Sequence, residues 1–140
     1  MKARPITVLM DVDTGVDDAL GIILALHATN EIRIVGITTA TGNTSSEQAA
    51  LNTYFLLQQY QLDVPIPVVV GASESLDGRL ATLVKDIHGP DGLGGVSSEF
   101  FSRQPPEQRR LALERQNAVD FILEAAERHG MNLRIVATGP

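Results

Sequence analysis

Four aspartates lie within eight residues near the start of the chain, where a short apolar run gives way to a longer one. They occupy the segment Asp11-Val12-Asp13-Thr14-Gly15-Val16-Asp17-Asp18-Ala19. Like charges this close together disfavour simultaneous ionisation, so either some of the pKa values rise or a cation compensates the charge. The hard oxygen atoms of carboxylates suit Ca²⁺ or Mg²⁺. The cluster therefore predicts a site for a divalent cation.

A purely structural interpretation accounts for part of this cluster. Thr14-x-x-Asp17 has the spacing of a helix capping box. Asp17 and Asp18 would also lie near the positive end of the helix dipole. The attraction between that end and each exposed carboxylate is worth roughly 0.3–1 kcal/mol. Asp11 and Asp13 remain unexplained, because acidic side chains at the end of a buried apolar strand gain nothing from the fold and usually mark a site. We therefore favour a functional site over simple capping.

Several other kinds of site are excluded by the residues present. An EF-hand loop that begins at Asp11 needs Gly at position 16 and Glu at position 22, where the chain has Val16 and Ile22. The sequence contains no Gly-Lys-Ser/Thr loop that would cradle a phosphate. Because cysteine is absent, a thiolate zinc site, a disulfide framework and a cysteine nucleophile are excluded as well.

A phosphoryl-transfer alternative stays open. Asp11-Val12-Asp13 after an apolar run resembles the Asp-x-Asp motif of haloacid dehalogenase-type phosphotransferases, which have Thr or Val two residues later, where this chain has Gly15. The lysine that such enzymes use is hard to place, since the chain contains only Lys2 and Lys85. A Mg²⁺-dependent aspartyl-phosphate phosphatase is therefore the less favoured interpretation.

The composition indicates one globular domain and argues against nucleic acid as a partner. The chain has 140 residues, 44% of them hydrophobic, and we expect residues 1–140 to form a single domain. Seventeen acidic and eleven basic side chains give a formal charge of −6, which repels nucleic acids. The first apolar segment is too short for a signal peptide or a membrane span, so we expect a cytoplasmic protein without a membrane partner.

Strands and helices are expected to alternate along the chain. Apolar runs predict strands at 6–10, 32–39, 67–71 and 132–140. Helices are predicted at 16–29, where the helix should be largely buried, from the capping signature Thr44-x-x-Glu47 to about residue 61, near 80–86, and in a last segment that ends at Gly130. This alternation predicts an α/β fold: a parallel sheet with helices on both faces, whose ligands bind beyond the carboxyl ends of the strands.

Three more polar residues are candidates for a site at that edge. Asn43 follows the second predicted strand, Thr138 follows the fourth, and His88 lies in a glycine-rich loop. Each also has an ordinary explanation, because Asn43 suits a turn beside Gly42, Thr138 ends a strand, and a loop histidine is often simply solvated. For each of the three residues, the ordinary explanation and a role in binding both stay open.

The acidic segment resembles the signature of the inosine-uridine preferring nucleoside hydrolases, Asp-Thr-Asp-Pro-Gly-Ile-Asp-Asp-Ala, with Thr14 in place of the usual proline. Three later segments are similar to other motifs of that family: Gly42-Asn43 followed by Glu47-Gln48, His88-Gly89-x-x-Gly92-Leu93-Gly94, and Ala137-Thr138-Gly139-Pro140. The acidic motif is highly specific and the other three are weak alone. All four occur in the family's order along most of this chain.

The resemblance implies a Rossmann-like core and a Ca²⁺-dependent nucleosidase of purine or pyrimidine salvage, which hydrolyses a nucleoside to base and ribose. Asp13 would bind the Ca²⁺ ion and act as general base on a metal-bound water. Asp18 would be a bidentate ligand of the same ion, and the Thr138 carbonyl would complete part of the shell. A bound cation makes such chemistry reasonable at neutral pH because it lowers the pKa of its water.

The resemblance also implies how the nucleoside would be held. Asp17 and Asn43 would bind ribose hydroxyls, and His88 would contact the base. Asp11 would be a supporting carboxylate that orients the loop. The site would then stabilise the positive charge of an oxocarbenium-like transition state, as in other glycoside hydrolyses.

Members of that family continue well beyond the position that corresponds to Pro140. Their later half supplies a further Asp ligand, ribose-binding Asn and Glu residues, and often a His that protonates the leaving base. We therefore expect this chain to be a truncated, N-terminal part of such a fold, and we expect it to form a homo-oligomer. The main alternative is a non-catalytic domain that acts by association with itself or with a partner.

Overall fold

The fold is built around parallel strands. The computed structural model describes residues 4–78, 83, 85–105 and 116–140. Its strands are β1 (Ile6–Val12), β2 (Ile32–Thr39), β3 (Val68–Val70) and β4 (Leu133–Ala137). They form one sheet in the order β3-β2-β1-β4, and every neighbouring pair is parallel. The loops that follow β2, β1 and β4 therefore emerge side by side at one edge of the sheet.

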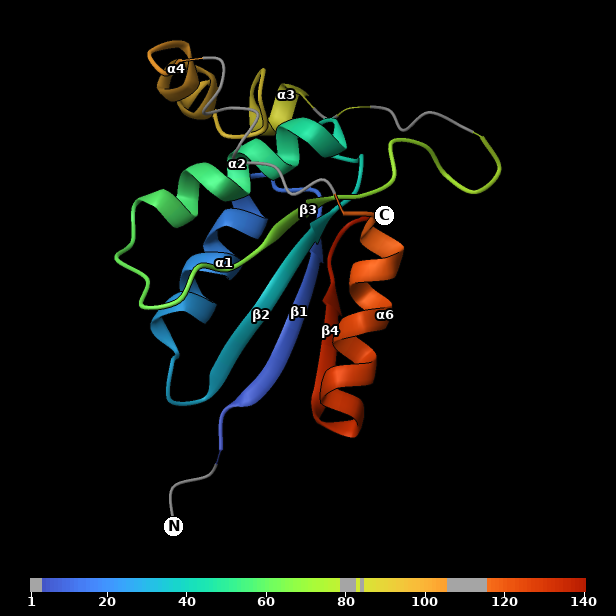
Figure 1. The fold of residues 1–140 in the computed structure, drawn as a ribbon. Helices are drawn as coiled ribbons and strands as arrows, with labels where there is room; N and C mark the ends of the chain where they lie inside the picture. Colours follow the sequence, from blue (N-terminus) through green and yellow to red (C-terminus); the bar gives the residue numbers. More distant parts are fainter. Residues whose placement is uncertain (1–3, 79–82, 84, 106–115) are drawn as a thin grey trace.

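Helices cover both faces of this sheet, as the alternating pattern predicted. Helices α1 (Val16–His27) and α2 (Ser46–Gln58) lie on one face, and α6 (Ala118–His129) lies on the other (Figure 1). The short helices α3 (Lys85–His88) and α4 (Val96–Ser102) lie beyond the carboxyl ends of the strands (Figure 1). The α/β prediction with a parallel sheet is thus confirmed.

The main hydrophobic core lies between the sheet and the α1–α2 layer. Met10 and Val12 of β1 pack there with Ile22 of α1 and Leu57 of α2. Only one side of α1 takes part, because Leu20 is 64% exposed on the other side. The expectation that this helix is largely buried was therefore wrong. Because its apolar residues follow one another without a break, the sequence did not indicate that this helix has one buried and one exposed side.

Several boundaries differ from those that the sequence predicted. β1 continues past Met10 to Val12, because Val12 still pairs with Thr39 of β2. Helix α2 is capped by Ser45, whose hydroxyl accepts a hydrogen bond from the Gln48 N–H, and not by Thr44. The short helix expected near 80–86 is found at Lys85–His88, and residues 79–82 and 84 lie outside the described part.

Helix α4 was not predicted, and aromatic side chains attach it to α2. The rings of Phe55 and Phe100 have centroids 5.1 Å apart, and those of Tyr54 and Phe101 are 6.3 Å apart. Phe101 is buried. The two aromatic pairs hold the segment that follows the glycine-rich loop against α2, and thereby limit where that loop can lie.

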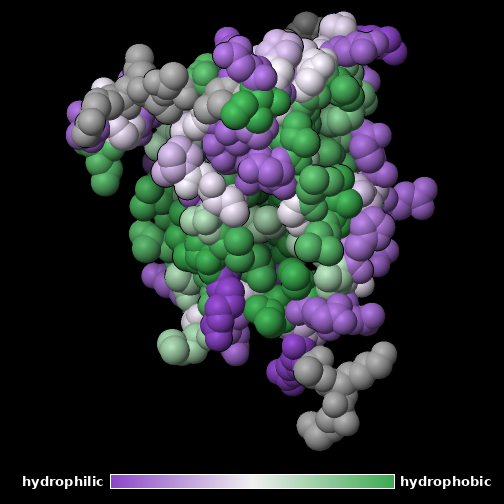
Figure 2. Space-filling model, turned by 180° about the vertical axis from the view of Figure 1, so that it is seen from behind, coloured by the Kyte–Doolittle hydropathy of each residue, from purple (hydrophilic) through white to green (hydrophobic). Residues whose placement is uncertain are grey.

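The β4 side of the sheet carries exposed apolar side chains. Ile135 and Val136 of β4 are 51% and 40% exposed, and Val119 and Leu123 of α6 are exposed too. Seen from behind, the molecule has a hydrophobic area across its middle (Figure 2).

In the part of the chain that the structure describes, no helix is long and apolar enough to cross a membrane.

Candidate active site

The acidic segment forms the turn between β1 and α1. β1 ends at Val12, and α1 begins at Val16 after the extended residue Gly15. The loops after the two neighbouring strands are tied to this turn, since the Ala40 N–H donates to the Val12 carbonyl at 2.9 Å and the Thr138 N–H donates to the Asp11 carbonyl at 2.9 Å. Three strand ends thus meet at the acidic turn.

Asp13 and Asp18 form the buried centre of the site. Both residues are only 6% exposed. Asp13 Oδ2 accepts a 2.6 Å hydrogen bond from the backbone N–H of Asn43, and Asp18 Oδ1 accepts one of 2.6 Å from the Thr138 hydroxyl. The loops after β2 and β4 therefore each hold one of the two carboxylates.

Capping of α1 falls to Asp18 and not to Asp17. The Gly15 N–H donates to Asp18 Oδ2 at 3.2 Å, so the carboxylate satisfies the backbone at the start of the helix. The Thr14-x-x-Asp17 capping box was a wrong prediction, because Thr14 turns inward and its hydroxyl hydrogen-bonds to that of Thr53 at 2.7 Å. The side chain of Asp17 is exposed and lies near His88.

The environment of Asp13 opposes its ionisation. Burial raises the pKa of Asp13, the negative charge of Asp18 and a hydrogen bond with that side chain raise it further, and the Asn43 N–H opposes the rise. The close contacts that the structure describes between acidic and basic side chains are His88 with Asp17 and Arg103 with Glu99, so among the described residues no cationic side chain neutralises Asp13 or Asp18. The charge of this pair has no compensation from the described part of the protein.

A Ca²⁺ ion fits this donor set. Two buried carboxylates that face each other supply hard oxygen ligands, and a divalent cation would remove the repulsion that raises the pKa of Asp13. The described residues contain no group of three His, Cys, Asp or Glu side chains placed to hold a metal. Further ligands would therefore have to be carbonyls, hydroxyls, water or groups beyond the described residues.

Asn43 and His88 meet above the same turn. A Cβ atom on Gly15 would lie 2.6 Å from Asn43 Nδ2 and 2.7 Å from His88 Nδ1, so both side chains approach the glycine closely. His88 Nδ1 accepts a hydrogen bond of 3.2 Å from the Val16 N–H and lies 3.9 Å from Asp17 Oδ1. The glycine-rich loop and the loop after β2 thus both reach the acidic turn.

Asp11 lies on the strand itself, to one side of this centre. Its Oδ1 accepts a short hydrogen bond of 2.5 Å from the Thr38 hydroxyl of β2. Asp11 therefore joins β1 to β2 beneath the turn. This position agrees with a supporting carboxylate better than with a nucleophile.

The predictions missed a set of buried polar residues beneath the site. Asn52 and Thr53 of α2 are fully buried, and Asp91 of the glycine-rich loop is 2% exposed. Their signal in the sequence was weak. Two adjacent polar residues in the middle of α2 interrupt its apolar positions, and Asp91 stands in a segment dominated by glycine. Neither feature indicates which groups these side chains contact in the folded protein.

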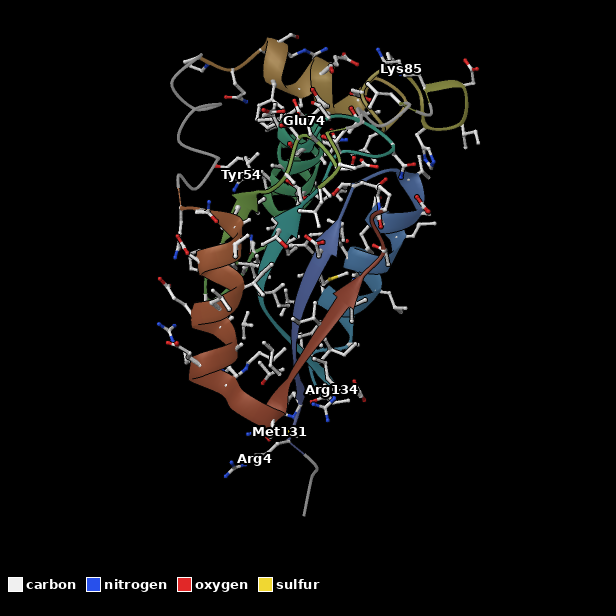
Figure 3. The ribbon with its side chains drawn as sticks, turned by 90° about the vertical axis from the view of Figure 1, so that its right-hand side faces the viewer. Arg4, Tyr54, Glu74, Lys85, Met131 and Arg134 are labelled. Carbon is white, nitrogen blue, oxygen red and sulfur yellow. The ribbon has the colours of Figure 1, made fainter. Side chains whose placement is uncertain are left out.

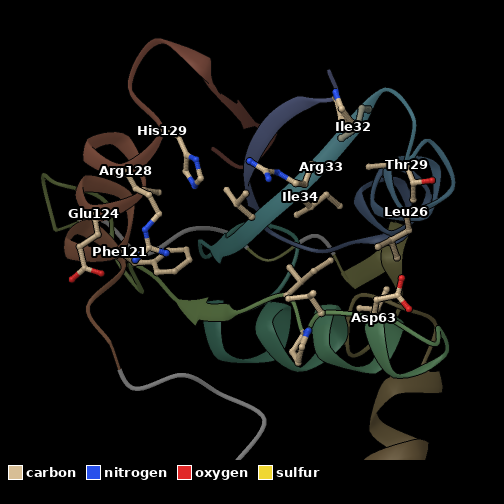
Figure 4. Close-up of a pocket in the computed structure, with 18 residues that line it drawn as sticks. Leu26, Thr29, Ile32, Arg33, Ile34, Asp63, Phe121, Glu124, Arg128 and His129 are labelled. Carbon is tan, nitrogen blue, oxygen red and sulfur yellow. The ribbon is translucent and has the colours of Figure 1, made fainter. Parts of the chain in front are cut away.

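A pocket lined largely by apolar residues lies at the opposite end of the sheet. It has a volume of about 590 Å³ and is lined by residues such as Leu26, Ile32 and Phe121 (Figure 4). A polar hollow of about 690 Å³ adjoins it and is lined by Arg4, Arg33, Arg128 and Arg134, among others. Arg4, Met131 and Arg134 lie at this end, whereas Lys85 lies at the other (Figure 3). Neither cavity includes a residue of the acidic turn.

Comparison with known proteins identifies the family. Residues 8–140 match the family model described as inosine-uridine preferring nucleoside hydrolase. Uridine nucleosidase 1 of Arabidopsis thaliana is 33% identical over 132 residues, which are 94% of this chain and 36% of that protein. The inosine-uridine preferring nucleoside hydrolase of Leishmania major is 33% identical over 136 residues, which are 96% of this chain and 40% of that protein.

Solved structures agree with these relatives. An inosine-guanosine nucleoside hydrolase superposes with a TM-score of 0.77 and 30% identity over 96% of this chain and 39% of that one. A purine-preferring ribonucleoside hydrolase from Gardnerella vaginalis gives a TM-score of 0.77 and 32% identity over 96% and 40%. This chain therefore spans less than half the length of the relatives that it matches. It belongs to the family of inosine-uridine preferring nucleoside hydrolases.

Proposed function

We propose that this chain provides the water-activating and ribose-binding part of a nucleoside N-ribohydrolase. The observation that carries the proposal is the buried pair Asp13 and Asp18, which the loops after β2 and β4 hold by one hydrogen bond each. Family membership supports nucleosides as the substrate class. The chain's relatives include enzymes named for uridine and for inosine, so the preferred base is left open.

Asp13 and Asp18 are the residues that would hold a Ca²⁺ ion, with Thr138 beside them. When bound, the ion supplies positive charge that acidifies a water molecule and attracts the hydroxyls of the sugar. Asp18 is fixed by both the Thr138 hydroxyl and the Gly15 N–H, which leaves little freedom for its carboxylate to rotate. A ligand restrained in this way loses little entropy when it binds a cation.

Asp13 would be the general base. It takes a proton from water as the water oxygen forms a bond to the anomeric carbon, and the C–N bond breaks with its electron pair passing to the base. Carboxylates nearby stabilise the positive charge that develops on the sugar ring. The leaving base gains its proton from solvent or from an acid that the described residues do not identify.

Three residues around the turn would hold the nucleoside. Asp17 has an exposed carboxylate and Asn43 an amide beside Gly15, so both suit ribose hydroxyls. His88, which lies beside them at the same turn, would face the base. Asp11 keeps the role of support, since it is bonded to Thr38 of the neighbouring strand.

The test is release of reducing sugar from a panel of purine and pyrimidine nucleosides with Ca²⁺. The Asp13→Asn variant, which keeps the shape of the side chain, is expected to lose at least about a hundredfold in kcat. Asp63→Asn, at an exposed aspartate remote from the turn, is the matched control and should keep the wild-type rate. Equal rates for the wild type and Asp13→Asn would contradict the role of Asp13, and an inactive wild type would contradict hydrolysis by this chain.

A second candidate is association through the β4 side of the sheet. The exposed apolar residues of β4 and α6 favour it, since contiguous apolar surface commonly marks an interface. Association and hydrolysis are compatible, because this surface does not include the acidic turn. Its test is the oligomeric state.

A further inference from the structure

We propose that Asn52 is a positioning residue that fixes the glycine-rich loop at 88–95 on the acidic turn and so places His88 beside Asp17. The inference rests on the proposed function, because it assigns a residue to that same site. It also goes beyond it, because Asn52 touches neither the acidic pair nor the space above it. Asn52 belongs to α2 and would act through the two segments that it joins.

The amide group of Asn52 bridges the turn and the loop. Its Nδ2 donates to the Thr14 carbonyl at 3.0 Å and to the Asp91 carbonyl at 2.7 Å. Its Oδ1 accepts from Gln48 Nε2 at 2.9 Å. Asn52 is fully buried, so both hydrogens of its amide nitrogen are committed and water does not compete for them. A single side chain therefore connects two segments that are far apart in the sequence.

The loop itself is a preorganised unit that this bridge can hold as a whole. The Asp91 carboxylate accepts hydrogen bonds from the N–H groups of Leu93, Gly95 and Ser98, at 2.9, 2.7 and 2.8 Å. These bonds fold the backbone around the carboxylate. The Asp91 carbonyl oxygen accepts a hydrogen bond from Asn52 Nδ2. Because the rest of the loop is folded around Asp91, this hydrogen bond positions the whole loop.

Close packing at Gly92 reinforces the bridge. A Cβ atom at Gly92 would lie 3.0 Å from Asn52 Nδ2 and 3.1 Å from the Thr14 carbonyl oxygen, and the residue has φ of +91°. Only glycine fits there without strain. The loop thus sits directly on the hydrogen bond between Asn52 and Thr14, with no room for adjustment.

The far end of the loop reaches the site. His88 is the first residue of this loop and accepts a hydrogen bond from the Val16 N–H through Nδ1, with Asp17 Oδ1 at 3.9 Å. As an acceptor, Nδ1 carries no proton, so the ring is the tautomer protonated at Nε2. Loss of the bridge would let the loop lift, break this bond and remove the preference for one tautomer.

The test is the tautomer of His88, read from the ¹⁵N shifts of its ring nitrogens by NMR. The chain has three histidines, and His88→Gln assigns the signal. We expect the wild type to show the Nε2-protonated ring, and Asn52→Leu to shift toward the mixture of a free imidazole. Ser45→Ala is the control in the same helix, since it removes the cap to Gln48 and lowers the melting temperature without touching the bridge.

A tautomer signal that stays unchanged in Asn52→Leu, despite a lower melting temperature, would show that Asn52 is merely structural and would overturn the proposal. If Asn52→Leu fails to fold, Gly92→Ala tests the same contact from the loop and is expected to give the same shift. An unchanged His88 signal in a folded Gly92→Ala protein would equally count against the bridge.

Kinetics separate this proposal from the proposed function. In an active protein, Asn52→Leu should raise the KM for nucleosides about tenfold, because His88 and Asp17 lose their mutual placement. A purely structural loss would lower the active fraction, and so the apparent kcat, at an unchanged KM. If the wild type proves inactive, hydrolysis by this chain fails, while the tautomer of His88 still decides whether Asn52 holds the loop.

Discussion

Hydrogen bonds from two different loops hold Asp13 and Asp18 together although their charges repel. The Asn43 N–H and the Thr138 hydroxyl each satisfy one oxygen, and the remaining oxygens have no cationic partner among the described side chains. In the folded state, the negative charges of the two carboxylates therefore repel each other at short range. A bound divalent cation converts that repulsion into attraction.

Calcium is therefore expected to raise the melting temperature. At a concentration one hundred times its Kd, a ligand of the folded state adds about 2.7 kcal/mol, or roughly 10 °C for a protein of this size. Asp18→Ala should abolish the rise, and Asp63→Ala, at an exposed site, should keep it. Thermal unfolding followed by circular dichroism with Ca²⁺ and with EDTA measures the difference. A melting curve insensitive to millimolar Ca²⁺ would exclude the metal site.

Gly42 is the residue whose replacement should disturb Asp13 most selectively. A Cβ atom there would come 2.1 Å from Asp13 Oδ2 and 2.8 Å from Pro140 Cδ. Gly42→Ala must therefore displace the Asp13 carboxylate, and we expect it to shrink the calcium-dependent rise in melting temperature by more than half.

The matched control for that change is Gly21→Ala in α1. A Cβ atom at Gly21 would meet nothing within 4 Å, and alanine favours a helix interior by about 0.5–1 kcal/mol. Gly21→Ala should raise the melting temperature and leave the response to Ca²⁺ intact. Equal responses to Ca²⁺ in Gly42→Ala and in the wild type would show that Gly42 does not shape the site.

Residue types alone predicted the acidic cluster but not the polar residues that support it. Four aspartates within eight residues are conspicuous, because helix capping accounts for only part of them. Asn52 and Asp91 are single polar residues in unremarkable surroundings, and their importance depends on which carbonyl and N–H groups the fold brings to them. Contacts between distant segments leave no periodic trace in a sequence.

At the scale of the elements, the glycine-rich loop is held by the carboxylate of one residue. Burial raises the pKa of Asp91, but hydrogen bonds from the backbone N–H groups of Ser98, Leu93 and Gly95 outweigh it and leave the pKa below its ordinary value. The folded state therefore favours the ionised form. The resulting stability is present above the ordinary pKa of an aspartate and is lost as the pH falls through the lowered value.

Asp91→Asn is accordingly expected to reduce the free energy of unfolding by about 1–3 kcal/mol at neutral pH, because an amide oxygen cannot replace a carboxylate with three donors. The deficit should shrink toward zero as the pH falls below the lowered pKa, where the wild-type carboxyl is protonated too. Urea unfolding between pH 7 and pH 3 tests this. Asp86→Asn, at an exposed residue of α3, should show no such dependence on pH.

The elements with clear periodicity were predicted and those defined by tertiary contacts were not. Strand β2 was predicted at its observed bounds, because its apolar run ends in polar residues on both sides. Helix α4 was missed, because its seven residues are too few for a periodic signal and its Phe100 and Phe101 gain their meaning from the aromatic rings of α2. The start of α2 was misplaced by one residue, since Thr44 and Ser45 are both good caps.

The whole molecule is asymmetric in how well it covers its sheet. One face is packed by α1 and α2, whereas β4 and α6 retain exposed apolar residues. The alternation of strands and helices predicted layers on both faces but carried no information about strand order, which determines that β4 is the exposed edge. The position of β4 next to β1 also explains why Thr138 can reach Asp18.

We expect the exposed edge to make the protein associate at high concentration. The average mass from light scattering should rise with protein concentration, and Val136→Lys, which adds a charge to the edge strand, should lower it. Ser102→Lys, at an exposed residue of α4, is the control and should leave the association unchanged. A monomer at every concentration would exclude association through β4.

The arginines around the polar hollow have a consequence for the charge of the molecule as a whole. Arg4, Arg33, Arg128 and Arg134 gather at the amino end of the sheet, while Asp13, Asp17 and Asp18 stand at the carboxyl end. The acidic turn is thus a local cluster of negative charge, and the arginines form a local cluster of positive charge that Asp63 and Glu124 of the neighbouring pocket partly offset. In a solution of low ionic strength, the negative charge at the acidic turn would attract cations over a long range, before any of them touches a ligand.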